Sequence, residues 1–231
     1  MKTFLRFSFP TVLLAIFFSA FAVTETKAQT PLGKVLERME THRQSLSSLR
    51  ANVTMVKYDS VLKVSDTTEG TSMYVPLKGR DALVRIDWTK PAQETLSVVK
   101  GQYIIYRPRL NQYLTGSTKD TKGSGKANGA LSFMNMSKAQ LKANYNINYL
   151  GLENVVGGIP TWHLELTPKT AQSYKLAELW VDGNGMPIQA KIVEKNNDTT
   201  TVLLSNIKKN ETISTAEFIV KLPKGVKQIK G

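Results

Sequence analysis

The feature that most constrains the fold of this chain is a pattern of short apolar runs that begins at Ala51. β-branched and aromatic residues alternate there with polar ones, and Gly, Asp, Asn and Pro separate one run from the next. Val84, Ile86 and Trp88, for example, alternate with charged residues. A period of two residues is typical of antiparallel strands with one apolar face and one solvated face.

The pattern predicts a series of strands joined as hairpins. Their expected positions are residues 51–59, 61–66, 70–77, 82–88, 95–100, 102–107, 112–116, 146–153, 159–168, 174–182, 186–196, 199–208 and 216–221. Connections such as those at 100–101 and 182–185 supply the glycines and short polar residues that tight turns need. A meander of this size twists and curls, and it then closes as a barrel or wraps around another layer.

Two parts of the chain are expected to be helical. In the first part, apolar residues recur at helical spacing, at Leu32, Val35, Leu36, Met39, Leu46 and Leu49. The second part comprises Leu131–Met134 and the stretch from Ser137 to Tyr145, with Ser137 as a candidate N-cap. Both must bury an apolar stripe. The predicted fold is therefore mainly β: an incomplete, half-open antiparallel β-barrel of about 11 strands, with N-terminal and central helices forming a lid.

The N-terminus has the features of a secretory signal. A basic start precedes an apolar stretch from Phe7 to Val23, and residues suited to cleavage end at Ala28. We therefore expect a signal peptide at 1–28 and a single domain at 29–231, which is long enough to bury one core. A retained membrane anchor is the alternative, although Pro10 and the short apolar stretch favour cleavage.

The chain contains no cysteine. This excludes disulfide bonds, thiolate chemistry and cysteine metal ligands. It also excludes the acylated cysteine that anchors a bacterial lipoprotein, because Gln29 follows the expected cleavage site. We therefore expect an exported protein that is soluble in the periplasm and not lipid-anchored.

Residues that could carry out catalysis are sparse. The two histidines, His42 and His163, do not form a metal-ligand pattern, and no Gly-x-Ser-x-Gly motif is present. Residues 123–126 resemble part of a phosphate-binding loop, but Asp120 and Ala127 stand where that loop needs Gly and Ser or Thr. The sequence thus predicts no enzyme, no cofactor and no metal site.

The chain is strongly basic, with a formal net charge of +13 at pH 7. We expect no nucleic-acid partner for an exported protein. Its positive charge would instead attract an anionic membrane surface or an acidic protein. Lys119, Lys122 and Lys126, in a turn-rich stretch at 116–130, are the candidates for that contact. A solvated basic face without a partner is the alternative. We expect a monomer.

The alternation leaves two interpretations of the apolar face. One is an ordinary packed core, because every antiparallel sheet protein has this pattern. The other is a hollow lined by aliphatic and aromatic side chains with few polar groups, which would suit acyl chains.

Several segments carry a family resemblance. Residues 91–108 read PAQETLSVVKGQYIIYRP, which combines a turn, a strand, a Lys-Gly hairpin and a Tyr-x-Pro ending. The segment RIDW precedes it at 85–88, and further segments follow at 178–182 (ELWVD), 186–189 (MPIQ), 199–206 and 218–226. In this order, these segments resemble the outer-membrane lipoprotein carrier family, LolA and its relatives.

The resemblance implies a carrier that moves acylated lipoproteins or other lipids across the periplasm without chemistry. It also implies an inner-membrane donor transporter and an outer-membrane acceptor. The residues then expected to line or cover the lipid-binding cavity are Leu36, Met39, Val84, Ile86, Trp88, Leu131, Phe133, Met134, Leu179 and Val181. A lid-contacting arginine of that family lies ahead of the Trp strand, and Arg80 or Lys78 is the candidate for this gating role here.

Two other classes of function stay open at this point. A periplasmic lipid- or lipoprotein-sensing regulatory protein of the RseB type would use the same fold. A secreted all-β hydrolase would need nucleophiles and bases that the sequence supplies poorly.

Overall fold

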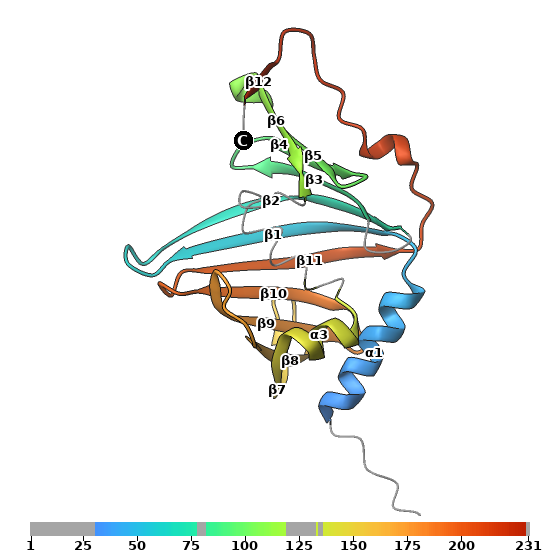
Figure 1. Cartoon of the computed structure of the whole chain (residues 1–231), viewed down its shortest axis with the longest axis vertical. Helices are drawn as coiled ribbons and strands as arrows, with labels where there is room; N and C mark the ends of the chain where they lie inside the picture. The colour runs from blue at the N-terminus through green and yellow to red at the C-terminus, as the bar shows by residue number, and fades with distance from the viewer. Residues whose placement is uncertain (1–30, 78–81, 119–132, 134–135, 230–231) are drawn as a thin grey trace, which may run out of the picture.

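The structure is a computed structural model that describes residues 31–77, 82–118, 133 and 136–229 (Figure 1). The strands are β1 (Leu49–Asp59), β2 (Val64–Pro76), β3 (Ala82–Lys90), β4 (Glu94–Val99), β5 (Gln102–Arg107), β6 (Gln112–Ser117), β7 (Tyr145–Val155), β8 (Ile159–Pro168), β9 (Tyr174–Asp182), β10 (Pro187–Glu194), β11 (Thr199–Lys209) and β12 (Lys227–Ile229). The helical elements are α1 (Pro31–Ser45), η1 (Pro108–Leu110), α3 (Lys138–Asn144) and η4 (Thr215–Phe218). The expected signal peptide lies outside the described residues.

The described strands form one sheet of 12 strands in the order β12-β6-β5-β4-β3-β2-β1-β11-β10-β9-β8-β7. Pairing of β1 with β11 joins the two halves of the chain. β12 pairs parallel with β6, and the other neighbours are antiparallel. The sheet stays open because the strands at its two ends, β12 and β7, do not pair with each other. The predicted half-open antiparallel sheet with helices is confirmed, with 12 strands instead of about 11.

The structure corrects three of the predicted strands. Residues 61–66 and 70–77 are not separate strands, because β2 is continuous. Gly70 lies inside β2, where a Cβ atom would come within 2.3 Å of the Asp87 carbonyl oxygen on β3, so only glycine fits there. Residues 216–221 do not form a strand, because a capping box between Ser214 and Glu217 turns the chain into η4.

α1 is shorter than the predicted apolar pattern, and α3 begins at the predicted N-cap. α1 ends at Ser45, so Leu46 and Leu49 do not extend it, and Leu49 instead begins β1. α3 begins after the predicted N-cap, Ser137, whose hydroxyl accepts a hydrogen bond from the Gln140 backbone N–H at 3.2 Å. The Gln140 side chain accepts one from the Ser137 N–H at 2.9 Å. The prediction of this helix is confirmed.

The main core lies between the helices and one face of the sheet, which we call the inner face. On the sheet side, Val53, Ile86 and Leu179 are 1%, 0% and 0% exposed. The helical segments add Val35, Leu36, Met39, Phe133 and Leu141, all at most 4% exposed. Burying one side chain of this size stabilises the fold by about 1.5–3 kcal/mol, so this layer supplies most of the apolar stabilisation.

The turn between β9 and β10 holds α1 against the sheet. Arg38 Nη1 donates to the Gly183 carbonyl oxygen at 2.6 Å. Gly185, with φ +88°, lies so close to α1 that a Cβ atom would be 2.2 Å from the Arg38 carbonyl oxygen. Backbone therefore packs directly on backbone, which fixes the position of the helix.

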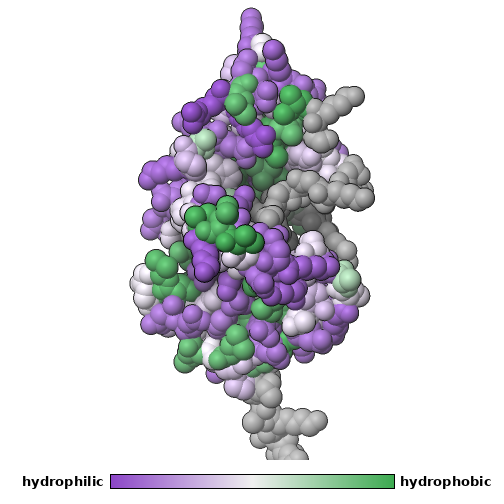
Figure 2. Space-filling view, turned by 90° about the vertical axis from the view of Figure 1, so that its left-hand side faces the viewer, coloured by the Kyte–Doolittle hydropathy of each residue, from purple (hydrophilic) through white to green (hydrophobic). Residues whose placement is uncertain are grey.

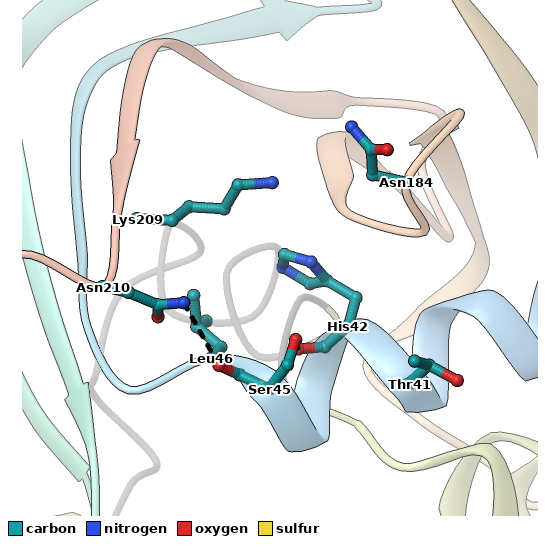
Figure 3. A pocket seen from close by; sticks show the side chains of 7 residues that line it. All are labelled: Thr41, His42, Ser45, Leu46, Asn184, Lys209 and Asn210. Carbon is teal, nitrogen blue, oxygen red and sulfur yellow. Dashed lines mark hydrogen bonds between the residues drawn. The ribbon is translucent and has the colours of Figure 1, made fainter.

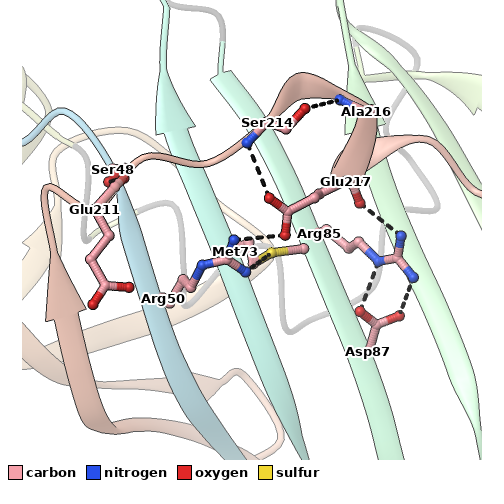
Figure 4. A network of polar contacts seen from close by, with 9 residues as sticks. All are labelled: Ser48, Arg50, Met73, Arg85, Asp87, Glu211, Ser214, Ala216 and Glu217. Atoms are coloured by element: carbon pink, nitrogen blue, oxygen red, sulfur yellow. Dashed lines mark hydrogen bonds and ion pairs between the residues drawn. The ribbon is translucent and has the colours of Figure 1, made fainter.

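The segment after β11, residues 210–226, contacts the outer face of the sheet (Figure 4). Arg50 Nη2 of β1 contacts Glu217 Oε2 at 2.6 Å, and Arg85 Nη1 of β3 donates to the Glu217 carbonyl oxygen at 2.7 Å. Ser97 of β4 donates to the carbonyl oxygen of Phe218, whose own side chain is 0% exposed. We call residues 210–226 the C-terminal segment; it links β1, β3 and β4 before the chain reaches β6 as β12.

Candidate functional site

Strand register brings apolar side chains into line across the inner face. Tyr74 of β2 pairs with Val84 of β3, Val84 with Val98 of β4, and Val98 with Tyr103 of β5. Two residue pairs further along, on the same face, Leu96 of β4 pairs with Ile105 of β5. Directly opposite residues point to the same side of a sheet, so these residues form one continuous apolar surface.

The two halves of the inner face differ in how well they are covered. On β8 to β11, inner residues such as Leu164, Ala177 and Val202 are fully buried. On β2 to β5 the inner face is only half-buried at the five residues that we call the apolar ladder: Tyr74, Val84, Val98, Tyr103 and Ile105. A partly exposed apolar surface next to a packed core is the arrangement that can accept an apolar ligand.

A glycine shapes the far end of the apolar ladder. Gly116 of β6 pairs with Tyr103, and a Cβ atom at Gly116 would lie 2.5 Å from the Tyr103 hydroxyl oxygen. The Tyr103 side chain therefore lies flat across β6 in space that only glycine leaves free. This orientation keeps the ring on the inner face.

The apolar ladder carries no charge of its own and ends in an ion pair. Burial raises the pKa of the Tyr74 phenol, so this side chain is neutral near pH 7. At the end of the ladder, Arg107 Nε lies 2.6 Å from Glu94 Oε2. An uncharged surface with a charged border suits an amphiphile whose polar end stays near water.

Aromatic side chains form a second group on the inner face, beside the helices. The Tyr145 and Tyr174 hydroxyl oxygens are 2.7 Å apart, and the Phe133 ring centroid lies 5.6 Å from that of Tyr145. Burial, followed by the hydrogen bond with Tyr145, raises the pKa of Tyr174. Trp162 is half-buried and has the Arg38 guanidinium carbon 5.1 Å from its ring centroid.

Most of the predicted cavity residues lie on the inner face or on the element that covers it, but they are buried. Leu36, Met39, Ile86, Trp88, Phe133, Leu179 and Val181 are all at most 7% exposed, while Val84 is half-buried within the apolar ladder. Leu131, Met134, Arg80 and Lys78 lie outside the described residues, as do Lys119, Lys122 and Lys126. Their predicted roles stay predictions.

The other four members of the apolar ladder were not among the predicted site residues. Tyr103 and Ile105, like Val98, lie in predicted strands, where alternation alone could have assigned them to one face. What the sequence did not reveal is which part of the inner face the helices leave half-covered.

A small polar pocket lies where α1 ends (Figure 3). Its volume is about 260 Å³, and it is lined by Thr41, His42, Ser45, Leu46, Asn184, Lys209 and Asn210. His42 Nε2 is buried and has no hydrogen-bond partner among the described atoms. Burial, followed by the charge of Lys209, lowers the pKa of His42, so the ring is neutral near pH 7.

The second histidine lies on the outer face. His163 Nδ1 is 2.7 Å from Glu153 Oε2, and His163 Nε2 is 2.9 Å from Glu178 Oε2. Its ring stacks on Trp180 with centroids 4.2 Å apart. With 13% of its side chain exposed, His163 is less solvated than its place on the polar side of a strand suggested.

The described residues contain neither a candidate metal centre nor a helix suited to crossing a membrane. No group of three or more His, Asp or Glu side chains in this part of the chain could hold a metal ion. None of the helices in residues 31–77, 82–118 and 136–229 has the length and apolarity needed to cross a membrane.

Known proteins provide the final comparison. The sequence matches the family model described as outer membrane lipoprotein carrier protein LolA over residues 44–221. It is 26% identical over 147 residues to the outer-membrane lipoprotein carrier protein of Helicobacter hepaticus, and this match covers 64% of the chain and 66% of the relative, just under two thirds of its length.

Two solved structures share the fold. An uncharacterized conserved protein from Thermus thermophilus aligns with a TM-score of 0.55 at 12% identity, over 87% of this chain and all of that one (100%). MucB aligns with a TM-score of 0.51 at 14% identity, over 81% of this chain and 62% of its own. Because the family model spans well over half of the sequence, the predicted resemblance is confirmed: the chain belongs to the LolA family of outer membrane lipoprotein carrier proteins.

Proposed function

We propose that this protein is an exported periplasmic carrier that binds acyl chains of lipoproteins, or other lipids, and transfers them toward the outer membrane without catalysis. The observation that carries the proposal is the apolar ladder: Tyr74, Val84, Val98, Tyr103 and Ile105 are aligned across four strands and only half-buried. Each methylene group that leaves water for such a surface contributes about 0.8 kcal/mol, so an acyl chain lying along it would bind tightly.

Family membership supports the same proposal, because the relative from Helicobacter hepaticus is itself described as a lipoprotein carrier. In this proposal an inner-membrane transporter delivers the cargo and an outer-membrane acceptor receives it. The buried predicted residues, such as Leu36 and Leu179, would form the floor and the cover of the site, and the apolar ladder would contact the cargo.

Adjacent residues of β5 provide a sharp test of the binding face. Ile105 points to the inner face and Ile104 to the outer face, and both are half-buried. We expect Ile105→Asp to weaken binding of a fluorescent fatty acid by about tenfold or more, because a carboxylate would meet the alkyl chain. Ile104→Asp is the matched control and should bind as the unmodified chain does.

Native mass spectrometry of the purified protein, with and without added palmitate, checks the binding directly. If the protein takes up no acyl species, the carrier proposal is wrong. Equal binding losses in the two β5 variants, both with an intact circular dichroism spectrum, would show that the apolar ladder is not the binding face.

A lipid-sensing regulator of the RseB type is the alternative, and the fold that this chain shares with MucB is compatible with it. The two functions differ in what happens after binding. A carrier should release a bound fluorescent lipid to acceptor vesicles, whereas a sensor should retain the lipid while it contacts a regulatory partner. Transfer kinetics between labelled protein and vesicles distinguish them.

A further inference from the structure

The turn of the β1–β2 hairpin and the first residue of β2 carry three exposed aliphatic side chains. Val61, Leu62 and Val64 are 81%, 69% and 52% exposed, although loop positions of this kind are normally polar. The hairpin projects from the side of the sheet (Figure 1), and a view from that side shows a hydrophobic patch at mid-height among hydrophilic side chains (Figure 2). We call Val61, Leu62 and Val64 the hairpin tip.

The loop that carries the hairpin tip is held in a fixed conformation. All four backbone N–H groups of residues 60–63 donate within the protein. The Asp59 carboxylate accepts two of them at 2.8 and 2.9 Å, the Asp59 carbonyl oxygen accepts a third at 2.9 Å, and Asp198 of the neighbouring hairpin accepts the fourth at 2.9 Å. A loop with satisfied N–H groups can enter an apolar medium without leaving those donors unpaired.

Charged residues of both signs lie beside the hairpin tip: the Asp59 and Asp198 carboxylates accept N–H groups of the loop, and two lysines lie next to them. Lys63 lies between Leu62 and Val64. Lys195 belongs to the neighbouring β10–β11 hairpin. The two hairpins are in contact, because the Ser60 hydroxyl donates to the Asn196 carbonyl oxygen at 2.7 Å. Within the described part of the chain, neither lysine forms an ion pair. Lysine side chains beside exposed aliphatic ones are typical of segments that rest at a lipid–water boundary.

We propose that the hairpin tip docks this protein on anionic bilayers, with its aliphatic side chains entering the boundary between headgroups and acyl chains. Lys63 then contacts the anionic headgroups, and the excess of Lys and Arg over Asp and Glu in the chain adds a long-range attraction. A bilayer fits better than a protein partner, because a narrow projection of three side chains offers much less area than a stable protein interface buries. The tip lies outside the apolar ladder, so this inference does not rest on the proposed cargo binding.

The absence of cysteine from the sequence allows a direct test. Val61→Cys in the full chain is labelled with an environment-sensitive NBD dye, and Leu110→Cys, at a residue that is 59% exposed in η1, is the matched control. With vesicles of phosphatidylglycerol and phosphatidylcholine, the dye at position 61 should shift to the blue and be quenched by spin-labelled lipids, while the dye at position 110 should not respond. Identical responses at both positions, or none at either, overturn the proposal.

Vesicle flotation provides an unlabelled readout. The double variant Val61→Ser, Leu62→Ser should partition at least about tenfold less than the unmodified chain, and Leu110→Ser should be unchanged. Raising the ionic strength, or omitting phosphatidylglycerol, should also reduce binding. Unchanged flotation of the double variant contradicts the proposal. Fatty-acid uptake measured on the same variant should be unaffected, which separates this result from a failure of the cargo site.

Discussion

Glu40 connects the two helices through a single carboxylate. It accepts hydrogen bonds from Arg43 at 2.5 and 3.2 Å, from Gln44 at 2.9 Å and from the Lys138 N–H at the start of α3 at 2.9 Å. These contacts, with the Arg43 hydrogen bond as the largest, lower the pKa of Glu40 from 4.5 to about 2. Since the folded state holds this proton less readily than the unfolded chain, the stabilisation is complete above pH 4.5 and is lost as the pH falls toward 2.

We therefore expect Glu40→Gln to lower the free energy of unfolding at pH 7 by about 1–2 kcal/mol, because charge-assisted hydrogen bonds are lost at a partly exposed site. The variant should also lose most of this pH dependence. Urea denaturation at pH 7 and below pH 4 measures both effects. Glu37→Gln is the control, since Glu37 is 58% exposed and lies 3.5 Å from Lys138 Nζ; an equal loss there would contradict the assignment.

Gly185 is expected to be irreplaceable. Its positive φ and the 2.2 Å approach to the Arg38 carbonyl oxygen mean that Gly185→Ala must displace either the β9–β10 turn or α1. We expect a loss of about 3 kcal/mol or more in the free energy of unfolding. Gly158→Ala, at φ +73° with nothing within 4 Å of the added Cβ, should cost only about 1 kcal/mol. Similar midpoints for the two variants in thermal unfolding would refute the close packing.

Individual elements differed in how far the sequence could predict them. The predicted strands 159–168 and 174–182 coincide with β8 and β9, because alternation and turn residues are local signals. β2 was divided into two strands, because the need for Gly70 arises from β3, which is distant in sequence. β12 is three residues long and parallel, so it has no alternation to detect. η4 did have a local signal, the Ser214-x-x-Glu217 capping box, but the apolar run after it favoured a strand.

The candidate site was harder to predict than the strands. Alternation placed Val84, Ile86 and Trp88 on one face, and the register confirms this placement. Burial then separates them: Ile86 is 0% exposed and Val84 is half-buried. That difference depends on which strands the helices cover, a long-range property that no single strand encodes.

The C-terminal segment should contribute strongly to stability through Phe218. Phe218→Ala should lower the free energy of unfolding by about 3–4 kcal/mol, because the side chain is 0% exposed and its removal leaves a cavity on the outer face. The adjacent Ile219 is 60% exposed, so Ile219→Ala should change stability by less than about 0.5 kcal/mol. Urea denaturation compares the two, and limited proteolysis should cut residues 210–226 faster in the Phe218 variant. Equal stabilities would mean that this segment is only loosely attached.

For the whole molecule, the two halves of the sheet are expected to differ in their dynamics. The strands under the helices, β8 to β10, should exchange backbone hydrogens slowly, because inner side chains such as Leu164, Leu179 and Ala190 are fully buried. β4 and β5 should exchange faster, and palmitate should slow exchange mainly in β3 to β5. Hydrogen–deuterium exchange with mass spectrometry resolves these segments. Uniform protection, or a change confined to β8 to β10, would place the ligand elsewhere.

The C-terminal segment also limits how the molecule can adapt to ligands of different size. Its contacts with Arg50, Arg85 and Ser97, followed by the β12–β6 pairing, act as a brace from the middle of the sheet to one end. Spreading β1 to β6 apart would break these bonds together. In the proposed carrier, longer or branched alkyl groups would therefore be accommodated by changes in side-chain rotamer on the inner face, while the backbone keeps its curvature.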